Sequence, residues 1–275
     1  MANAPKPTTI SKESSSASNL FAVLVIPICI IIGILIYKFV LGDPNNFIDN
    51  NVENGPKPGN YGGMAYKGGP IVPVLMGMLL MVFVFSVERF IVISKATGAG
   101  SLDAFIKKIQ GYLASSNIEA AMSECDKQKG SVANVIKSGL KKYREMEVET
   151  NMDTDQKCLA IQKDIEEATT LEMPMLEQNL TVIATLVSVG TLTGLLGTVT
   201  GMIKAFGGLA TSGAPDQAAL ANGISEALIN TATGIATSTV AIIMYNILTS
   251  KIDKLTYAID EAGFSIIQTY ASTHK

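Results

Sequence analysis

Four long stretches of apolar residues alternate with polar segments along this chain of 275 residues. Each stretch holds about 20 residues, the length that an α-helix needs to cross the hydrocarbon core of a bilayer. We therefore predict an all-α membrane protein with four transmembrane helices. The pattern divides the chain into a disordered polar tail at 1–19, a span at 20–41, a Gly- and Pro-rich loop at 42–70, a span at 71–93, a helical domain at 94–175, a span at 176–209, a turn at 210–217, a span at 218–250 and an amphipathic tail at 251–275.

The first apolar stretch allows two interpretations. It follows Lys6 and Lys12, as the apolar region of a secretory signal peptide would. However, it is longer than such a region, and Leu41 is followed by Gly, Asp and Pro rather than by a small-residue cleavage site. We interpret it as a retained span. The next segment, 42–70, clusters Pro, Gly and Asn, which argues against a helix, so we expect a flexible external loop.

The segment 94–175 has a different pattern, because its apolar residues recur at helical spacing among Lys and Glu residues. Several amphipathic helices are therefore expected. From Lys157 the pattern continues into the third span, which predicts one helix to Phe206, about 75 Å long, with a bend near Pro174. The tail 251–275 should also be helical, either on the membrane surface or within the helical domain. The apolar positions concerned are Leu102, Phe105, Ile106, Ile109, Val132, Val135, Ile136, Leu140, Ile161, Ile165, Ala168, Leu171, Ile259, Phe264 and Ile267.

The amino-acid composition excludes several classes of function. Charged residues make up 16% of the chain, below the roughly 25% usual for soluble domains, which agrees with a membrane protein. A net charge of −3 gives no basic footprint, so we expect no nucleic-acid partner. The three cysteines are scattered and the single histidine is His274, so no metal site, disulfide framework or catalytic cluster is visible. We expect neither a cofactor nor enzymatic activity.

The placement of lysine and arginine predicts the orientation of the spans. Basic residues flank the segment 94–175, whereas the loop 42–70 has few and the turn 210–217 has none. The positive-inside rule then places both termini and 94–175 in the cytoplasm, and the loop and turn outside. Glu88 and Arg89, about one turn before the end of the second span, are expected to form an interfacial ion pair.

The fourth span contains a single carboxylate, Glu226. An acid inside a membrane helix is costly, so its presence indicates a functional site. Asn230, Thr233 and Thr237 follow at helical spacing and form a polar stripe with it. Because loss of hydration disfavours the charged form of a carboxyl group, such a group can exchange a proton near neutral pH. We predict that the stripe lines a proton path; the alternative is a neutral acid that only donates a hydrogen bond between helices.

The third span should pack closely against the fourth. Helices in lipid associate through small residues, and glycines recur at spacings of three and four along the third span. Counted from the turn, Thr198 and Glu226 both lie roughly 15 Å below the outer surface, so we expect them to face each other. Lys204, nearer the turn, is expected to extend toward water; the alternative is that it sets the electric field at the entrance of the path. The glycines predicted to pack the two helices are Gly190, Gly194, Gly197, Gly201 and Gly234.

At these positions the sequence resembles the ExbB/TolQ/MotA proton-channel family of bacterial energy-transducing motors. The resemblance rests on LEQNLTVIAT from Leu176, GLLGTVTGM from Gly194 and ISEALINTATG from Ile224, and it extends over about 71–252. The acid at Glu226 favours the ExbB/TolQ branch over MotA, and the chain is most similar to ExbB. Three spans match the family plan, and the span 20–41 is additional.

The resemblance implies a homopentamer in the bacterial inner membrane, with helices of an ExbD-like partner in its central pore. Proton flow would energise a TonB-like protein for outer-membrane transport. The residues that match the family's most important positions are Thr198, Glu226 and Thr231, and the proton-binding aspartate belongs to the partner. A TolQ-like role in envelope maintenance and a secondary transporter are the alternatives. The family's Ala-Pro is here Gly190-Thr191, and its last-span proline is Val240, which predicts straighter helices.

Overall fold

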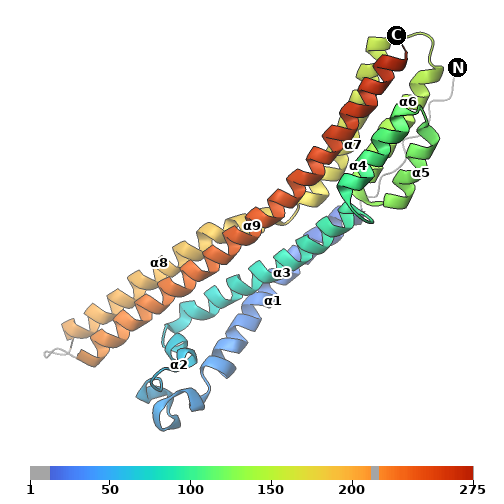
Figure 1. Ribbon diagram of the computed structural model, residues 1–275. Helices are drawn as coiled ribbons and strands as arrows, with labels where there is room; N and C mark the ends of the chain where they lie inside the picture. Colours follow the sequence, from blue (N-terminus) through green and yellow to red (C-terminus); the bar gives the residue numbers. More distant parts are fainter. Residues whose placement is uncertain (1–12, 212–216, 275) are drawn as a thin grey trace. The chain divides into compact units, whose positions relative to one another are not determined.

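The computed structural model (Figure 1) describes residues 13–211 and 217–274, and within them the secondary structure consists of helices joined by short turns and loops, with one isolated bridge between Phe47 and Pro56. Four helices in this part of the chain are long and apolar enough to cross a membrane, which confirms the predicted all-α membrane protein. The helices are α1 (Glu13–Ile36), α2 (Tyr61–Tyr66), α3 (Val72–Thr97), α4 (Leu102–Ala114), α5 (Ile118–Gln128), α6 (Gly130–Val148), α7 (Thr154–Glu177), α8 (Leu180–Thr211) and α9 (Gln217–Thr273).

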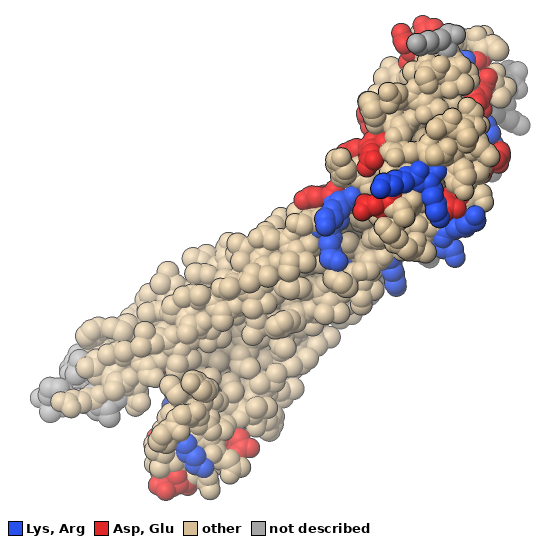
Figure 2. Space-filling view, viewed as in Figure 1, with Lys and Arg blue, Asp and Glu red and all other residues tan. Residues whose placement is uncertain are grey.

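The chain divides into two compact units. The first contains the described parts of residues 1–85 and 181–245, and the second contains residues 86–180 and 246–275. Two helices, α3 and α9, contribute to both units. On the face seen in Figure 2, charged side chains gather over the second unit and over the segment after α1, whereas the surface of α8 and the adjoining part of α9 is uncharged. An uncharged, apolar surface is what lipid contact requires.

In the first unit, α1 packs against α3 through glycine. A Cβ atom added to Gly33 would lie 2.5 Å from the Pro73 carbonyl oxygen, and one added to Gly77 would lie 3.0 Å from the Ile30 Cα. Only glycine permits such an approach of two helix backbones. From Phe21 to Ile36, the remaining surface of α1 is apolar and suited to lipid. Its exposed residues include Val23, Leu24, Ile28, Ile31, Ile34 and Leu35. The additional span is therefore an integral part of this unit.

The segment 42–70 contains short helical turns, although its composition argues against a helix and predicts a flexible loop. The reason is local capping by Asn and Tyr side chains. Asn46 donates to the Leu41 carbonyl oxygen at 3.0 Å, and Tyr37 stacks on Tyr66 with ring centroids 4.6 Å apart. The Tyr37 hydroxyl also donates to the Tyr66 carbonyl oxygen at 2.8 Å. The short helical turns of the segment are Pro44–Asn46, Ile48–Asn50, Val52–Asn54, α2 and Gly69–Ile71, and a π-helix, Tyr37–Leu41, connects them to α1.

Helices α8 and α9 run side by side as an antiparallel pair (Figure 1). All five glycines predicted to pack them are buried. A Cβ atom on Gly194 would lie 2.9 Å from the Asn230 carbonyl oxygen and 3.1 Å from the Gly234 Cα. One on Gly201 would lie 2.9 Å from the Ala227 amide nitrogen. The close approach of the two backbones therefore depends on these positions having no side chain.

Gly194→Ala is expected to lower the thermal stability of the protein. The added methyl group meets backbone atoms of α9, which cannot turn aside, and overpacking of this kind costs about 1–3 kcal/mol. Gly111→Ala on α4 is the matched control, because a Cβ atom there meets nothing within 4 Å. That change should stabilise its helix by up to about 1 kcal/mol. Heat unfolding in detergent, followed by circular dichroism, measures both; an unchanged midpoint for Gly194→Ala would contradict the packing argument.

The second unit is a bundle of α4, α5, α6, α7 and the last part of α9. Most of the predicted amphipathic positions are buried in it, but Leu171 and Phe264 are exposed. The described part of the tail continues α9 to Thr273 without a break and belongs to this bundle. Near its end, the Tyr270 hydroxyl donates to the Met146 carbonyl oxygen at 2.8 Å. The buried apolar residues include Phe105, Ile106, Ile109, Val132, Val135, Ile136, Leu140, Ile161, Ile165 and Ile259.

The predicted single helix from Lys157 to Phe206 is wrong, because α7 ends at Glu177 and α8 begins at Leu180. Between them Asn179 adopts a positive φ of 63°, a conformation typical of the residue after a helix end. The amide of Gln178 donates to the Pro174 carbonyl oxygen at 3.0 Å, which closes the last turn of α7. The break therefore follows Pro174 by one turn rather than being a bend at the proline.

Arg89 caps the end of α7. Its Nε donates to Glu88 Oε2 at 2.6 Å, so the predicted pair is present. However, Arg89 is only 2% exposed, and it also donates to the Met175 and Leu176 carbonyl oxygens, at 2.9 and 3.4 Å. Carbonyl groups in the last turn of a helix lack partners within the helix and attract a cation. Arg89 is therefore buried at the break between α7 and α8, with Glu88 as its ion-pair partner.

Arg89→Gln is expected to destabilise the protein by about 3 kcal/mol, because it leaves Glu88 and two carbonyl groups of α7 without their cation. The matched control is Arg144→Gln. Arg144 also pairs with a glutamate, Glu119, at 2.7 Å, but both side chains are exposed. An exposed pair contributes no more than about 1 kcal/mol. Equal shifts of the heat-unfolding midpoint in the two variants would show that Arg89 has no special role.

Candidate functional site

The candidate site lies on the α8–α9 pair in the first unit and is centred on Glu226. The side chain of Glu226 is 13% exposed, and its Oε1 accepts a hydrogen bond from Lys204 Nζ at 2.6 Å. Lys204 therefore pairs with the acid, while its own side chain remains 55% exposed. The pair supplies a positive charge that stabilises a carboxylate in an apolar helix hairpin.

Thr198 faces Thr231 and not Glu226. The two threonine hydroxyls form a hydrogen bond, and the Thr198 hydroxyl also contacts the Gly194 carbonyl oxygen at 3.3 Å. The predicted pairing is off by about one helical turn because α8 continues to Thr211, beyond the end assumed from the sequence. Thr198 and Thr231, two of the three residues singled out by the family resemblance, are thus brought together. The third, Glu226, pairs with Lys204.

The other two polar residues of the predicted path have different surroundings. Asn230 is fully buried and faces α8, where a Cβ atom on Gly197 would lie 2.6 Å from its Cγ. Within the described part of the chain, neither its Oδ1 nor its Nδ2 has a hydrogen-bond partner. Thr233 donates to the Ile229 carbonyl oxygen of its own helix at 2.8 Å. The polar stripe is therefore not a chain of hydrogen-bonded side chains.

Two glycines that the sequence reasoning did not single out complete the surroundings of Glu226. They lie directly before α3, in the turn that ends the segment 42–70. A Cβ atom on Gly69 would overlap Glu226 Oε1 and lie 2.9 Å from its Cδ, and one on Gly68 would lie 2.7 Å from Ile229 Cγ2. The carboxylate is thus enclosed by Lys204 on one side and by this backbone turn on another. The only available signal in the sequence was the Gly-Gly-Pro run before an apolar span.

An apolar groove of about 550 Å³ runs along α8 beside the threonine pair. Thr198 is the only residue with a hydroxyl group among those that line it. Thr198, whose hydroxyl meets that of Thr231, connects the groove to the threonine pair. It is lined by Leu195, Thr198, Val199, Met202, Ile203 and Phe206.

Comparison with known proteins identifies the family. The model of the MotA/TolQ/ExbB proton channel family matches residues 127–261. The Tol-Pal system protein TolQ of Pseudomonas aeruginosa is 32% identical over 156 residues, which make up 56% of this chain and 67% of that protein. The chain belongs to the MotA/TolQ/ExbB proton channel family. The resemblance noted in the sequence is thereby confirmed.

Other relatives in the family match over shorter ranges. The biopolymer transport protein ExbB of Pseudomonas putida is 33% identical over 86 residues, or 31% of this chain and 26% of that protein. ExbB of Salmonella typhimurium is 37% identical over 70 residues, or 26% of this chain and 29% of that protein. The range that matches the family model includes Thr198, Lys204 and Glu226, whereas α1 and the Gly68–Gly69 turn lie outside it. The family is one of proton channels and not of enzymes.

Proposed function

We propose that this protein is the stator subunit of a motor driven by the proton-motive force in a bacterial inner membrane. With an ExbD-like partner it conducts protons and energises a TonB-like protein for outer-membrane transport. The observation that carries the proposal is the Lys204-paired carboxylate of Glu226 on the α8–α9 hairpin of a proton-channel family member. An acid held in this way inside an apolar hairpin has no evident structural need.

The proposed path uses the two side-chain contacts of the hairpin in different ways. The apolar groove on α8 receives a helix of the ExbD-like partner, whose acidic group carries the proton. The Thr198–Thr231 hydroxyl pair lies at that groove and offers hydrogen bonds to the passing group. Glu226 and Lys204 set the field at the mouth of the path. Asn230 and Thr233, which face α8 and their own backbone, belong to the packing of the hairpin.

The proposal includes the assembly and the orientation. Five copies surround the pore, both termini and the helical domain are cytoplasmic, and the segment 42–70 and the turn 210–217 are periplasmic. Support for the orientation comes from the distribution of lysine and arginine, which favours the cytoplasm for the second unit. Native mass measurement of the complex with its ExbD-like partner tests the subunit count, and a ring of any other size would contradict the pentamer.

A TolQ-like role in envelope maintenance is the second candidate. It is favoured by the TolQ match, which covers 67% of that relative, against 26% and 29% for the two ExbB relatives. A deletion strain separates the two roles. Loss of TonB-dependent uptake with normal resistance to detergent supports the ExbB-like role, and the reverse pattern supports the TolQ-like role. If the purified complex conducts no protons in liposomes, both are wrong.

Thr198→Ala is expected to lower proton flux at least about tenfold, because it removes the hydroxyl that meets Thr231 at the groove. Thr198→Ser is the control, since it keeps a hydroxyl at the same position and should retain most of the flux. Flux is followed with a pH-sensitive dye inside liposomes that contain the complex with its partner. Equal fluxes in the two variants would remove the hydroxyl pair from the path.

A further inference from the structure

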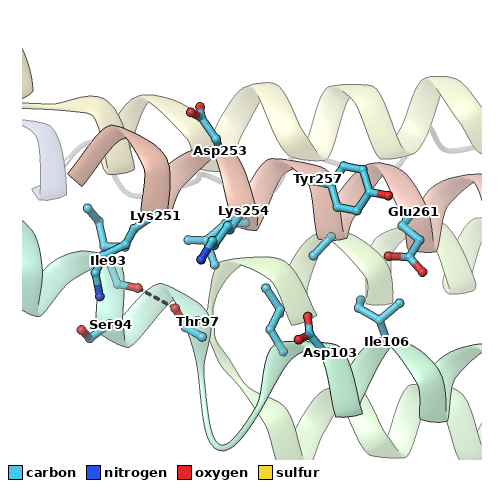
Figure 3. A pocket seen from close by; sticks show the side chains of 13 residues that line it. Ile93, Ser94, Thr97, Asp103, Ile106, Lys251, Asp253, Lys254, Tyr257 and Glu261 are labelled. Atoms are coloured by element: carbon cyan, nitrogen blue, oxygen red, sulfur yellow. Dashed lines mark hydrogen bonds between the residues drawn. The ribbon is translucent and has the colours of Figure 1, made fainter. Parts of the chain in front are cut away.

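A cavity of about 590 Å³ in the second unit lies outside the proposed proton path. It opens between the end of α3, the start of α4 and α9 (Figure 3). Its volume falls within the range of about 300–1,000 Å³ that is typical of small-molecule sites. Nothing in the proposed channel function uses it.

One end of this cavity is cationic. Figure 3 shows Lys251 and Lys254 extending from α9 toward α3, where Ser94 lies. Lys251 Nζ lies 4.3 Å from the centroid of the Phe90 ring. Within the described residues, neither lysine forms an ion pair with an acid. The cavity therefore holds two lysine ammonium groups that form no ion pair with the carboxylates lining it.

The acids that border the cavity do not cancel this charge. Asp253 projects from the opposite side of α9, and Asp103 and Glu261 lie toward the other end of the cavity (Figure 3). Glu261 Oε1 is also engaged, since it accepts a hydrogen bond from Gln110 Nε2 at 3.0 Å. An anion near Lys251 and Lys254 would thus meet attraction from both lysines without a carboxylate directly beside it.

Apolar surface adjoins the lysines. A smaller hollow of about 370 Å³ shares Lys251 and Lys254 with the cavity and adds Ile247, which is 45% exposed. On α3, Phe90 and Ile91 are 47% and 48% exposed. These residues belong to α3 and α9, two of the four described helices whose apolar stretches can cross a membrane. Cationic side chains next to exposed apolar ones at the end of a span match the two parts of a phospholipid, a charged headgroup and its acyl chains.

We propose that Lys251 and Lys254 bind the phosphate of an anionic phospholipid from the cytoplasmic leaflet. Its headgroup enters the cavity, where the Ser94 hydroxyl is a further hydrogen-bond donor, and its acyl chains lie against Phe90 and Ile247. A free phosphate ion would engage the lysines but would leave the apolar surface bare. A lipid covers both surfaces, and it would join the end of α3 to α9 within this unit.

The experiment is native mass spectrometry of the full-length protein in detergent, titrated with phosphatidylglycerol or phosphatidylcholine. The wild-type protein should bind phosphatidylglycerol in preference. Lys251→Gln with Lys254→Gln should weaken that binding about 25-fold, since each lysine near an anionic lipid contributes about fivefold. Arginine at both positions keeps the charge and should keep the binding, which separates loss of the site from loss of the fold.

The matched control is Lys107→Gln with Lys141→Gln, which removes the same charge from two exposed lysines elsewhere in the second unit. Binding should be unchanged in this control. Equal losses in the two double variants would reduce the effect to net charge and overturn the proposal. It is also overturned if phosphatidylcholine binds as well as phosphatidylglycerol, or if inorganic phosphate displaces the lipid at equal concentration, which would indicate a simple anion site.

Discussion

Glu226→Gln is expected to lower proton flux through the reconstituted complex by about 100-fold or more, because it removes the negative charge that balances Lys204 at the mouth of the path. Glutamine has almost the same shape as glutamate, so the hairpin and the assembly should remain intact. However, an amide cannot take up and release a proton at ordinary pH, and it cannot neutralise Lys204. Flux is measured with a pH-sensitive dye in liposomes. Assembly is checked by the mass of the complex.

Two further variants identify the cause of that loss. Glu53→Gln removes an exposed acid from the segment 42–70 and should leave the flux unchanged. Glu226→Gln combined with Lys204→Gln also removes the cation that the single change leaves unpaired. If the double variant conducts, the single variant was blocked by an uncompensated positive charge, which repels protons. If it remains inactive, the carboxyl group itself is required. Normal flux in Glu226→Gln alone would exclude Glu226 from the path.

Local patterns in the sequence were sufficient for the spans and for the amphipathic helices. Hydrophobic periodicity predicts which face of a helix is buried, and Ile106 and Val135 are buried as expected. The same patterns cannot predict the end of a helix that is determined by a distant partner. Arg89 donates to carbonyl oxygens of α7 that lie more than eighty positions away, so the break before α8 depends on a contact that periodicity does not contain.

The site shows a similar limit. The residue types of the hairpin indicated the acid and the threonines, but their pairing depends on the register of α8 against α9. That register depends on where the turn between the two helices begins. The turn lies a few residues later than the sequence suggested, so Thr198 meets Thr231 instead of Glu226. The contact of Gly69 with Glu226 could not be predicted. It brings a loop against a helix, and it is possible only because glycine has no side chain at that position.

Gly69→Ala is therefore expected to have the second largest effect, a fall in proton flux of about tenfold or more. The added methyl group would overlap Glu226 Oε1, so the carboxylate must move away from Lys204. Misplacing a functional group by about 1 Å can cost as much as 100-fold in rate. The measurement is the same liposome assay. Unchanged flux would show that the turn before α3 has no part in positioning Glu226.

Gly59→Ala separates this steric effect from backbone strain. Both glycines have a φ of 77°, which a residue with a side chain adopts only at a cost, but a Cβ atom on Gly59 meets nothing within 4 Å. The control therefore carries the same strain without the contact and should conduct normally.

Adding Glu226→Asp to Gly69→Ala shortens the acid by one methylene group and makes room for the new methyl. The effects of substitutions at two residues in direct contact are not independent. The double variant should therefore lose less flux than the product of the two single losses. Losses that simply multiply would mean that Gly69 and Glu226 act independently, and the turn would then be a structural feature of the loop only.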